Sequence, residues 1–226
     1  MTILYFVLAA LIGYVSGAVP FGYLYVKATK GINILEYGSG RTGGTNSLRA
    51  AGWKVGTLTG LSDVVKGFLG VTLARLFLGS AVDAALLPWV LGVAGVMTVV
   101  GHNWSVFLGW RGGAGTGPNI GWATALWWPM FPIGFVVMVG LLLTVGMASV
   151  ASLAMALIIP IGFAALYFGG VAGYDHTAAY LLCGIASALV VTWALRPNIK
   201  RLLEGQERVV GPRAKRIERR MKNAEG

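Results

Sequence analysis

The sequence has few charged residues, a single cysteine and only two histidines. Charged residues make up 12% of its 226 residues, hydrophobic residues make up 56%, and the mean hydropathy is +0.73. A soluble domain carries about 25% charged residues. The composition therefore excludes an ordinary water-soluble fold and indicates an integral membrane protein.

The scarcity of cysteine and histidine limits the kinds of site the chain can hold. Cys183 lies in an apolar run, so one chain contains neither a disulfide framework nor a cysteine metal site. His102 and His176 are expected on opposite sides of the membrane, which argues against a metal site or a Ser-His-Asp arrangement. We expect no metal and no cofactor.

The charged residues are mostly basic. The sequence has 18 Lys and Arg and 8 Asp and Glu, which gives a net charge of +10. Residues 27–54 hold five basic residues and one acidic residue, and residues 196–226 hold ten and four. Cytoplasmic loops of membrane proteins are enriched in Lys and Arg. We therefore expect both segments in the cytoplasm, next to membrane lipids, and expect no nucleic-acid partner.

Uncharged runs predict where the chain crosses the membrane. Spans are expected at about 3–26, 85–109, 150–169 and 177–195, and a glycine-rich run predicts another at about 56–78. The stretch 112–148 is too long for one upright helix of about 20 residues. Pro129 and Pro132 interrupt it, and proline breaks helices.

Breaking this stretch near Pro129-Pro132 gives seven spans, one of them short, and leaves the basic tail in the cytoplasm. A single span there would place the tail outside. The predicted fold is an all-α integral membrane protein with its N-terminus outside and its C-terminus cytoplasmic. Residues 1–195 form the membrane domain, and residues 196–226 form a basic cytoplasmic tail with a short surface helix from Gly205.

A glycine-rich polar segment, residues 38–49, is the first candidate site. Its glycines let the backbone approach a ligand closely, and its hydroxyl, amide and guanidinium groups suit an anion. These groups belong to Ser39, Arg41, Thr45, Asn46 and Arg49. The Gly-Lys-Ser/Thr ending of a Walker A loop is absent. The alternative is a flexible loop at the membrane surface.

A second glycine-rich segment, residues 109–117, ends where the short span begins, so its N–H groups could face an anion at a helix N-terminus. Alternatively, its glycines only allow close helix packing. Asp63 and Lys66 are three residues apart and share one helical face. Ionisable groups inside a span are candidates for function, and the alternative is an internal ion pair that fixes helix packing.

Five strings in this order resemble the bacterial membrane glycerol-3-phosphate acyltransferases that use acyl phosphate as donor. The strings cover most of the chain. They are Ser16-Gly17-Ala18-Val19-Pro20-Phe21-Gly22; Gly38-Ser39-Gly40 with Thr45-Asn46 and Arg49; Asp63-Val64-Val65-Lys66-Gly67; Gly101-His102 with Phe107-Leu108-Gly109 and Arg111-Gly112-Gly113; and Asn198-Ile199-Lys200-Arg201-Leu202 with Gly205 and Glu207.

The resemblance implies an enzyme without metal or coenzyme A that acylates the 1-hydroxyl of sn-glycerol 3-phosphate, giving lysophosphatidic acid for phospholipid biosynthesis. It would lie in the bacterial inner membrane with its active site facing the cytoplasm. The catalytic residues expected from motif and resemblance together are Ser39, Thr45, Arg49, Ser149 and Asn198. The expected phosphate-binding residues are Arg41, Asn46, Lys66, Arg111, Gly112, Gly113 and Gly115, and the structural polar residues are Asp63, His102 and Glu207.

The chain departs from the family pattern at three positions. The family's lysine of the second motif is replaced by Ala114, its asparagine of the first motif by Arg41, and its histidine of the third motif by Leu195. We hypothesise that Arg41 supplies the charge lost at Ala114. The alternatives are a non-catalytic phosphate- or lipid-binding membrane protein, an acyltransferase with an altered acceptor, and a transporter.

Overall fold

The computed structural model describes residues 1–171, 173–174, 178–211, 213–214, 216, 221 and 223, and these residues form helices without a β-strand. Short 3₁₀ turns lie at Ile34–Glu36 and Val106–Leu108. The α-helices are α1 (Thr2–Ala18), α2 (Phe21–Lys30), α3 (Gly44–Ala51), α4 (Trp53–Leu78), α5 (Leu87–Asn103), α6 (Thr116–Leu126), α7 (Met130–Thr144), α8 (Ala148–Phe168) and α9 (Ala178–Leu203).

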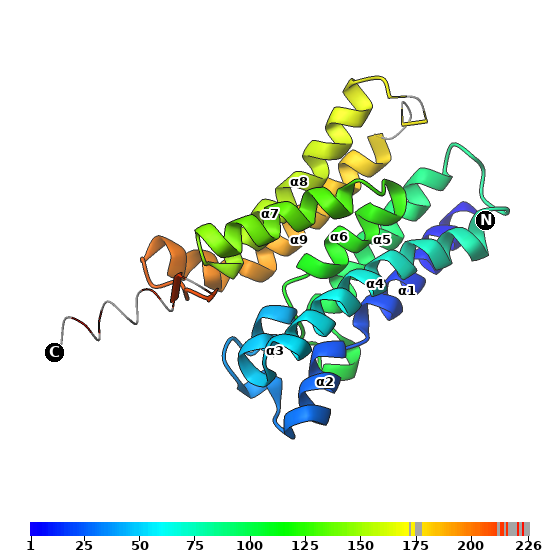
Figure 1. The fold of residues 1–226 in the computed structure, drawn as a ribbon. Helices are drawn as coiled ribbons and strands as arrows, with labels where there is room; N and C mark the ends of the chain where they lie inside the picture. The colour runs from blue at the N-terminus through cyan, green and yellow to red at the C-terminus, as the bar shows by residue number, and fades with distance from the viewer. Residues whose placement is uncertain are drawn as a thin grey trace.

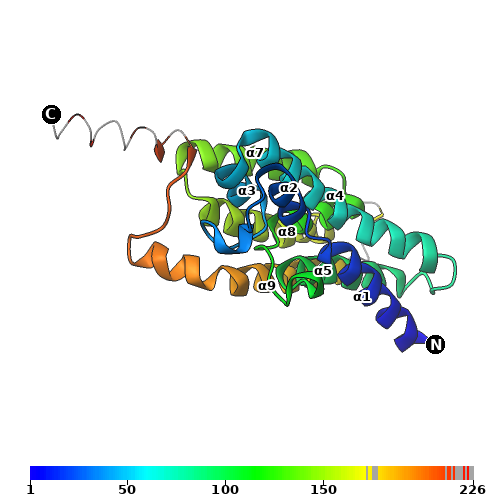
Figure 2. The same cartoon turned by 90° about the horizontal axis from the view of Figure 1, so that it is seen from below.

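The helices form a bundle in which α1, α4, α5 and α6 pack side by side, and α7, α8 and α9 lie against them (Figures 1 and 2). The segment Thr2–Lys30 and the helices α8 and α9 are long and apolar enough to cross a membrane, whereas α5 and α7 are shorter apolar helices. The predicted all-α class is confirmed. The expectation that His176 lies on the opposite side of the membrane from His102 concerns a residue outside the described ones.

The uncharged stretch 112–148 is broken into two helices, as its prolines predict. The 11-residue helix α6 ends at Leu126, and α7 begins at Met130. Pro129 caps α7, and Pro132 lies in its first turn, where a missing N–H costs nothing. The first turn of α6 touches both α4 and α8, because a methyl group on Gly117 would overlap Asp63 and Thr116 Oγ1 donates to Ser152 Oγ at 2.8 Å.

The predicted span at 3–26 is not one continuous helix, which corrects the expectation from hydropathy. Val19 has φ −57° and ψ 118°, because the residue before a proline is driven out of the helical region. The carbonyl groups freed by this break find side-chain donors. Lys66 Nζ donates to the Val19 carbonyl at 2.8 Å, and Ser105 Oγ donates to the Ala18 carbonyl at 2.6 Å.

Glycines bring α1 and α5 into direct backbone contact. A methyl group on Gly17 would overlap the carbonyl oxygen of Thr98, and one on Gly101 would overlap that of Tyr14. Small residues at such positions let helices in membranes approach closely. The glycines of these two helices are therefore required by packing.

The close contact between α1 and α5 predicts that Gly17→Ala lowers the free energy of unfolding by about 1–3 kcal/mol, the usual cost of overpacking. The matched control is Gly140→Ala, since a methyl group there meets no atom within 4 Å. Unfolding in detergent by denaturant checks both variants. Equal stability of Gly17→Ala and the wild type would contradict the packing argument.

Asp63 and Lys66 form a buried ion pair that ties α4 to the break in the first span. Lys66 Nζ lies 3.0 Å from Asp63 Oδ1, both residues are 3% exposed, and the same ammonium binds the Val19 carbonyl. Ser16 Oγ donates to the backbone carbonyl of Lys66 at 2.7 Å. The pair thus holds α1, α2 and α4 in one arrangement.

This pair predicts a non-additive double-mutant cycle. Asp63→Asn alone leaves a buried ammonium without its carboxylate and should cost about 3–5 kcal/mol of stability. Asp63→Asn combined with Lys66→Met should cost clearly less than the two single changes together. Denaturant unfolding in detergent measures all three variants, and simple additivity would show that the two charges act independently.

Candidate functional site

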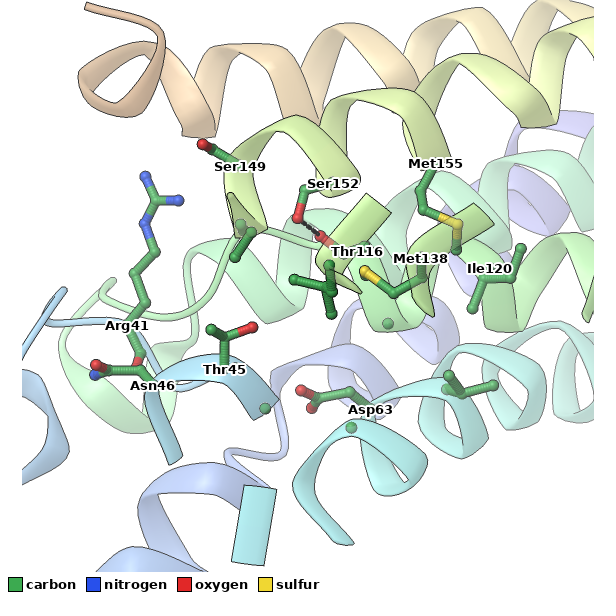
Figure 3. Close-up of a pocket in the computed structure, with 18 of the residues that line it drawn as sticks. Arg41, Thr45, Asn46, Asp63, Thr116, Ile120, Met138, Ser149, Ser152 and Met155 are labelled. Carbon is green, nitrogen blue, oxygen red and sulfur yellow. Dashed lines mark hydrogen bonds between the residues drawn. The ribbon is translucent and has the colours of Figure 1, made fainter. Parts of the chain in front are cut away.

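A cavity of about 330 Å³ lies where the loop before α3 meets α4, α6, α7, α8 and the end of α9 (Figure 3). Its volume falls within the range of small-molecule sites. One end is polar and the other apolar, because different helices line them. In Figure 3, Arg41, Thr45 and Ser149 lie toward one side, and Ile120, Met138 and Met155 lie toward the other.

The apolar end is formed by side chains of α4, α6, α7 and α8. It contains Leu61, Val64, Ile120, Phe131, Phe135, Met138, Val139, Leu142 and Met155. Within this lining, Gly134 is the one position on α7 without a side chain, and a methyl group there would overlap Ile120. This end suits a flexible alkyl group, since it offers methionine and aromatic surface and no charge.

Three helices begin at the polar end. Helix N-termini carry N–H groups without intrahelical partners and a partial positive charge, and both features attract anions. Among the described residues, the N–H groups of the first two residues of each of these helices make no hydrogen bond. The first-turn residues that line the cavity are Gly44 and Thr45 of α3, Thr116 and Gly117 of α6, and Ala148 and Ser149 of α8.

Two arginines add full positive charges to this end. Burial lowers the pKa of the Arg41 guanidinium, Arg201 lowers it further, and Glu207 opposes the shift. Burial also lowers the pKa of Arg49, and the charge of Arg208 adds to that effect. Arginine stays protonated in proteins, so both side chains bring cations to the cavity.

The loop before α3 is shaped by Asn46, which explains how its neighbours reach the cavity. Asn46 Nδ2 donates to the carbonyls of Tyr37 and Arg41, both at 2.9 Å, and its Oδ1 accepts from the Ser39 N–H at 3.1 Å. The amide is buried and lines the cavity while its polar atoms bind the loop. A direct phosphate contact by Asn46 stays a prediction.

The second glycine-rich segment packs beneath this loop. Arg111 Nη2 donates to the Leu35 carbonyl at 2.7 Å, the Gly112 carbonyl accepts from the Thr42 N–H at 3.3 Å, and the Gly113 N–H donates to the His102 carbonyl at 2.9 Å. A methyl group on Gly112 or Gly113 would overlap His102. This favours the packing interpretation for these two glycines.

Of the predicted phosphate-binding residues, Arg41 and Asn46 line the cavity. The lining does not include Lys66, Arg111, Gly112, Gly113 or Gly115. Lys66 is occupied by Asp63 and Val19, and Gly115 caps α6 with φ +84°, a value that favours glycine. A direct phosphate contact by these five residues stays a prediction.

The predicted catalytic residues, in contrast, meet at one place. Ser39, Thr45, Arg49, Ser149 and Asn198 all line the cavity, as do Asp63, His102 and Glu207. Glu207 organises one wall, because its carboxylate accepts from Ser149 Oγ at 3.0 Å, Asn198 Nδ2 at 2.9 Å and Arg201 Nε at 3.1 Å. The separate motifs thus form a single site.

Both positions where the family's lysine and histidine are missing, Ala114 and Leu195, line the cavity. Arg41 Nη2 donates to the carbonyl of Ala194, next to Leu195. Figure 3 shows Arg41 extending toward the wall that carries Ser149. The guanidinium therefore lies beside the position of the missing imidazole, within the same cavity as Ala114.

Sequence reasoning gave no role to four polar residues of the lining, which are Thr57, Thr116, Ser152 and Arg208. Thr116 Oγ1 donates to Ser152 Oγ at 2.8 Å, and Arg208 lies on the segment after α9. Thr116 gave no signal beyond its place at a helix start, and Arg208 was counted with the basic tail. Among the described residues, no three His, Cys, Asp or Glu side chains could hold a metal ion together.

Comparisons with a family model and with known relatives agree on one family. The family model described as glycerol-3-phosphate acyltransferase matches residues 7–205. The chain is 37% identical over 212 residues to a glycerol-3-phosphate acyltransferase of Thermus thermophilus, covering 90% of this chain and 94% of the relative. It is 36% identical over 227 residues to glycerol-3-phosphate acyltransferase 3 of Dehalococcoides mccartyi strain 195, covering 95% and 100%.

The fold is similar to crystal structures of PlsY, an integral membrane glycerol 3-phosphate acyltransferase. The glycerol 3-phosphate form has a TM-score of 0.76 at 30% identity and covers 91% of this chain and 96% of that chain. The lysophosphatidic acid form has a TM-score of 0.74 at 29% identity, covering 91% and 95%. The resemblance predicted from five motifs is confirmed, and the chain belongs to the glycerol-3-phosphate acyltransferase family.

Proposed function

We propose that the protein transfers an acyl group from acyl phosphate to the 1-hydroxyl of sn-glycerol 3-phosphate, giving lysophosphatidic acid and inorganic phosphate. One observation carries the proposal: a single cavity joins an alkyl-binding end to an anion-binding end made of three helix N-termini, Arg41 and Arg49. The names of the relatives, and the two forms of the similar crystal structures, agree with these substrates.

The reaction needs positioning and charge stabilisation more than a strong nucleophile, because acyl phosphate is already an activated mixed anhydride. Holding both reactants in line contributes about 7–11 kcal/mol to lowering the barrier. The alkyl chain occupies the apolar end, and its carbonyl lies where α6 and α8 begin. N–H groups at these helix starts then stabilise the oxyanion that forms.

The bond changes balance within the two substrates. The 1-hydroxyl oxygen attacks the carbonyl carbon, the bond from that carbon to the phosphate oxygen breaks, and phosphate leaves. The departing phosphate accepts the hydroxyl proton, so the step requires no imidazole base, consistent with Leu195. Donor and acceptor phosphates repel each other, and Arg41 and Arg49 reduce that repulsion at the polar end.

The polar end also suggests the orientation in the membrane. It is built from the basic segment 27–54 and the start of 196–226, which by the positive-inside rule face the cytoplasm. Helices α1 and α4–α9 then make seven passes with the N-terminus outside. We place the protein in the bacterial inner membrane, with 1–195 as membrane domain and 196–226 as cytoplasmic tail, although α9 runs continuously through the boundary.

Purified protein in lipid bilayers, given acyl phosphate and glycerol 3-phosphate, should release lysophosphatidic acid and inorganic phosphate in equal amounts. Mass spectrometry and a phosphate assay measure the two products. The control omits glycerol 3-phosphate and should release little phosphate. Binding of both substrates without turnover would instead support the non-catalytic alternative.

The charge hypothesis for Arg41 predicts a rescue. Because Arg41 and Ala114 line the same cavity, Arg41→Asn should lower kcat/KM by about 100-fold, and adding Ala114→Lys should restore most of it. Arg41→Asn with Ala114→Met is the matched control, since methionine adds length without charge. Initial rates of lysophosphatidic acid formation measure all variants, and an equal lack of recovery with lysine and methionine would reject the hypothesis.

A further inference from the structure

The chain after α9 forms a strap, residues 204–210, which runs from the end of α9 to the junction of α7 and α8 and lines the cavity with Glu207 and Arg208. Gly205, with φ +69°, ends the helix, and the Gln206 N–H donates to the Arg201 carbonyl at 2.7 Å. At its far end, the Val210 N–H donates to the carbonyl of Gly146, between α7 and α8, at 2.7 Å. Figures 1 and 2 show this orange segment leaving α9 and approaching the end of α7.

Glu207 fixes the middle of the strap. This residue is 8% exposed, and its carboxylate accepts hydrogen bonds from Ser149 on α8 and from Asn198 and Arg201 on α9. Arg208 follows directly and lies between the two anchors, Glu207 and Val210. The position of Arg208 in the cavity lining is therefore set by bonds on both sides of it.

Arg208 and Arg49 bring two positive charges to the same cavity from different parts of the chain. They are close enough that the charge of Arg208 adds to burial in lowering the pKa of Arg49, while Glu207 and Tyr37 oppose that shift. Within the described residues, neither guanidinium has a hydrogen bond or an ion pair. The two lining carboxylates are committed elsewhere, Asp63 to Lys66 and Glu207 to Arg201.

Two unpaired guanidiniums that repel each other are stabilised by a doubly charged anion between them. Guanidinium groups bind phosphate through two parallel hydrogen bonds, which gives them specificity as well as charge. Both proposed substrates carry phosphate. The acyl phosphate places its phosphate next to the carbonyl carbon, close to the apolar end. In glycerol 3-phosphate the attacking hydroxyl is on carbon 1 and the phosphate is on carbon 3. This separation lets the phosphate reach further into the polar end.

We propose that Arg208 of the strap and Arg49 of α3 together bind the phosphate of glycerol 3-phosphate, so that the strap supplies a specificity-determining residue for the acceptor. This inference rests on the proposed function. It assigns to the tail a cation that the sequence motifs do not contain. It also explains why Glu207 is buried, because that carboxylate holds Arg208 in place while Arg201 neutralises it.

Steady-state kinetics with each substrate varied in turn tests the proposal. Arg208→Gln should raise the KM for glycerol 3-phosphate by about 10- to 100-fold and leave the KM for acyl phosphate within about twofold. The KM of Arg208→Lys for glycerol 3-phosphate should lie between those of the wild type and Arg208→Gln, because lysine keeps the charge but lacks the paired N–H donors of a guanidinium. The matched control is Arg196→Gln, since Arg196 lies over the Trp193 ring at 4.3 Å and outside the cavity lining.

A binding measurement separates this proposal from the proposed function. Glycerol 3-phosphate should raise the unfolding midpoint of the wild type and of Arg196→Gln, and should raise that of Arg208→Gln much less. An equal shift in all three proteins, an unchanged KM for glycerol 3-phosphate, or a raised KM for acyl phosphate would each overturn the role of Arg208. Absence of turnover in the wild type, with the binding difference intact, would contradict the proposed reaction alone.

Discussion

Backbone groups without partners are the constraint on which this structure depends. A chain inside a bilayer has no water to bind its free N–H and C=O groups, yet this one breaks its helices repeatedly near one end. The free carbonyls are bound by the protein itself. Lys66 binds Val19, Ser105 binds Ala18, and Tyr14 Oη donates to the Trp104 carbonyl at 2.8 Å. The free N–H groups differ from the carbonyls, because the residues that carry them at the starts of α3, α6 and α8 line the cavity and bind no other group among the described residues.

This asymmetry gives the cavity its chemistry. Carbonyl groups facing the cavity would repel phosphate, and side chains from other helices cover them instead. N–H groups facing the cavity attract phosphate and need no ionisable residue to do so. N–H groups at these helix starts therefore contribute to the proposed anion site independently of the side chains at Ala114 and Leu195.

The sequence predicted those parts of the fold that depend on local chemistry. Prolines 129 and 132 predicted the break between α6 and α7, and the motifs predicted that Ser39, Thr45, Arg49, Ser149 and Asn198 serve one site. The kink at Pro20 was missed, because hydropathy across residues 3–26 is uninterrupted and its stabilising partner, Lys66, lies 47 positions from Val19. Such partners follow from tertiary packing and leave no local signal.

The strap also depends on tertiary contacts that the local sequence does not reveal. Its residues belong to a strongly basic tail, and such a tail is typical of a segment lying on an anionic membrane surface. The expectation of a surface helix from Gly205 is wrong for residues 206–210, which have no helical structure. The burial of Glu207 explains why this segment is not a surface helix. Its carboxylate accepts hydrogen bonds from three donors, and it would lose them if a surface helix placed it in water.

Two of the arginines that line the cavity come from irregular segments, so their positions depend on what holds those segments. Arg41 lies on the loop shaped by Asn46, and Arg208 lies on the strap held by Glu207. Each of these segments is thus held by one buried polar side chain that binds backbone or neighbouring residues. Under the proposed function, phosphate affinity depends on Asn46 and Glu207 as well as on the arginines, because a cation displaced by a few ångströms loses the geometry of its paired hydrogen bonds.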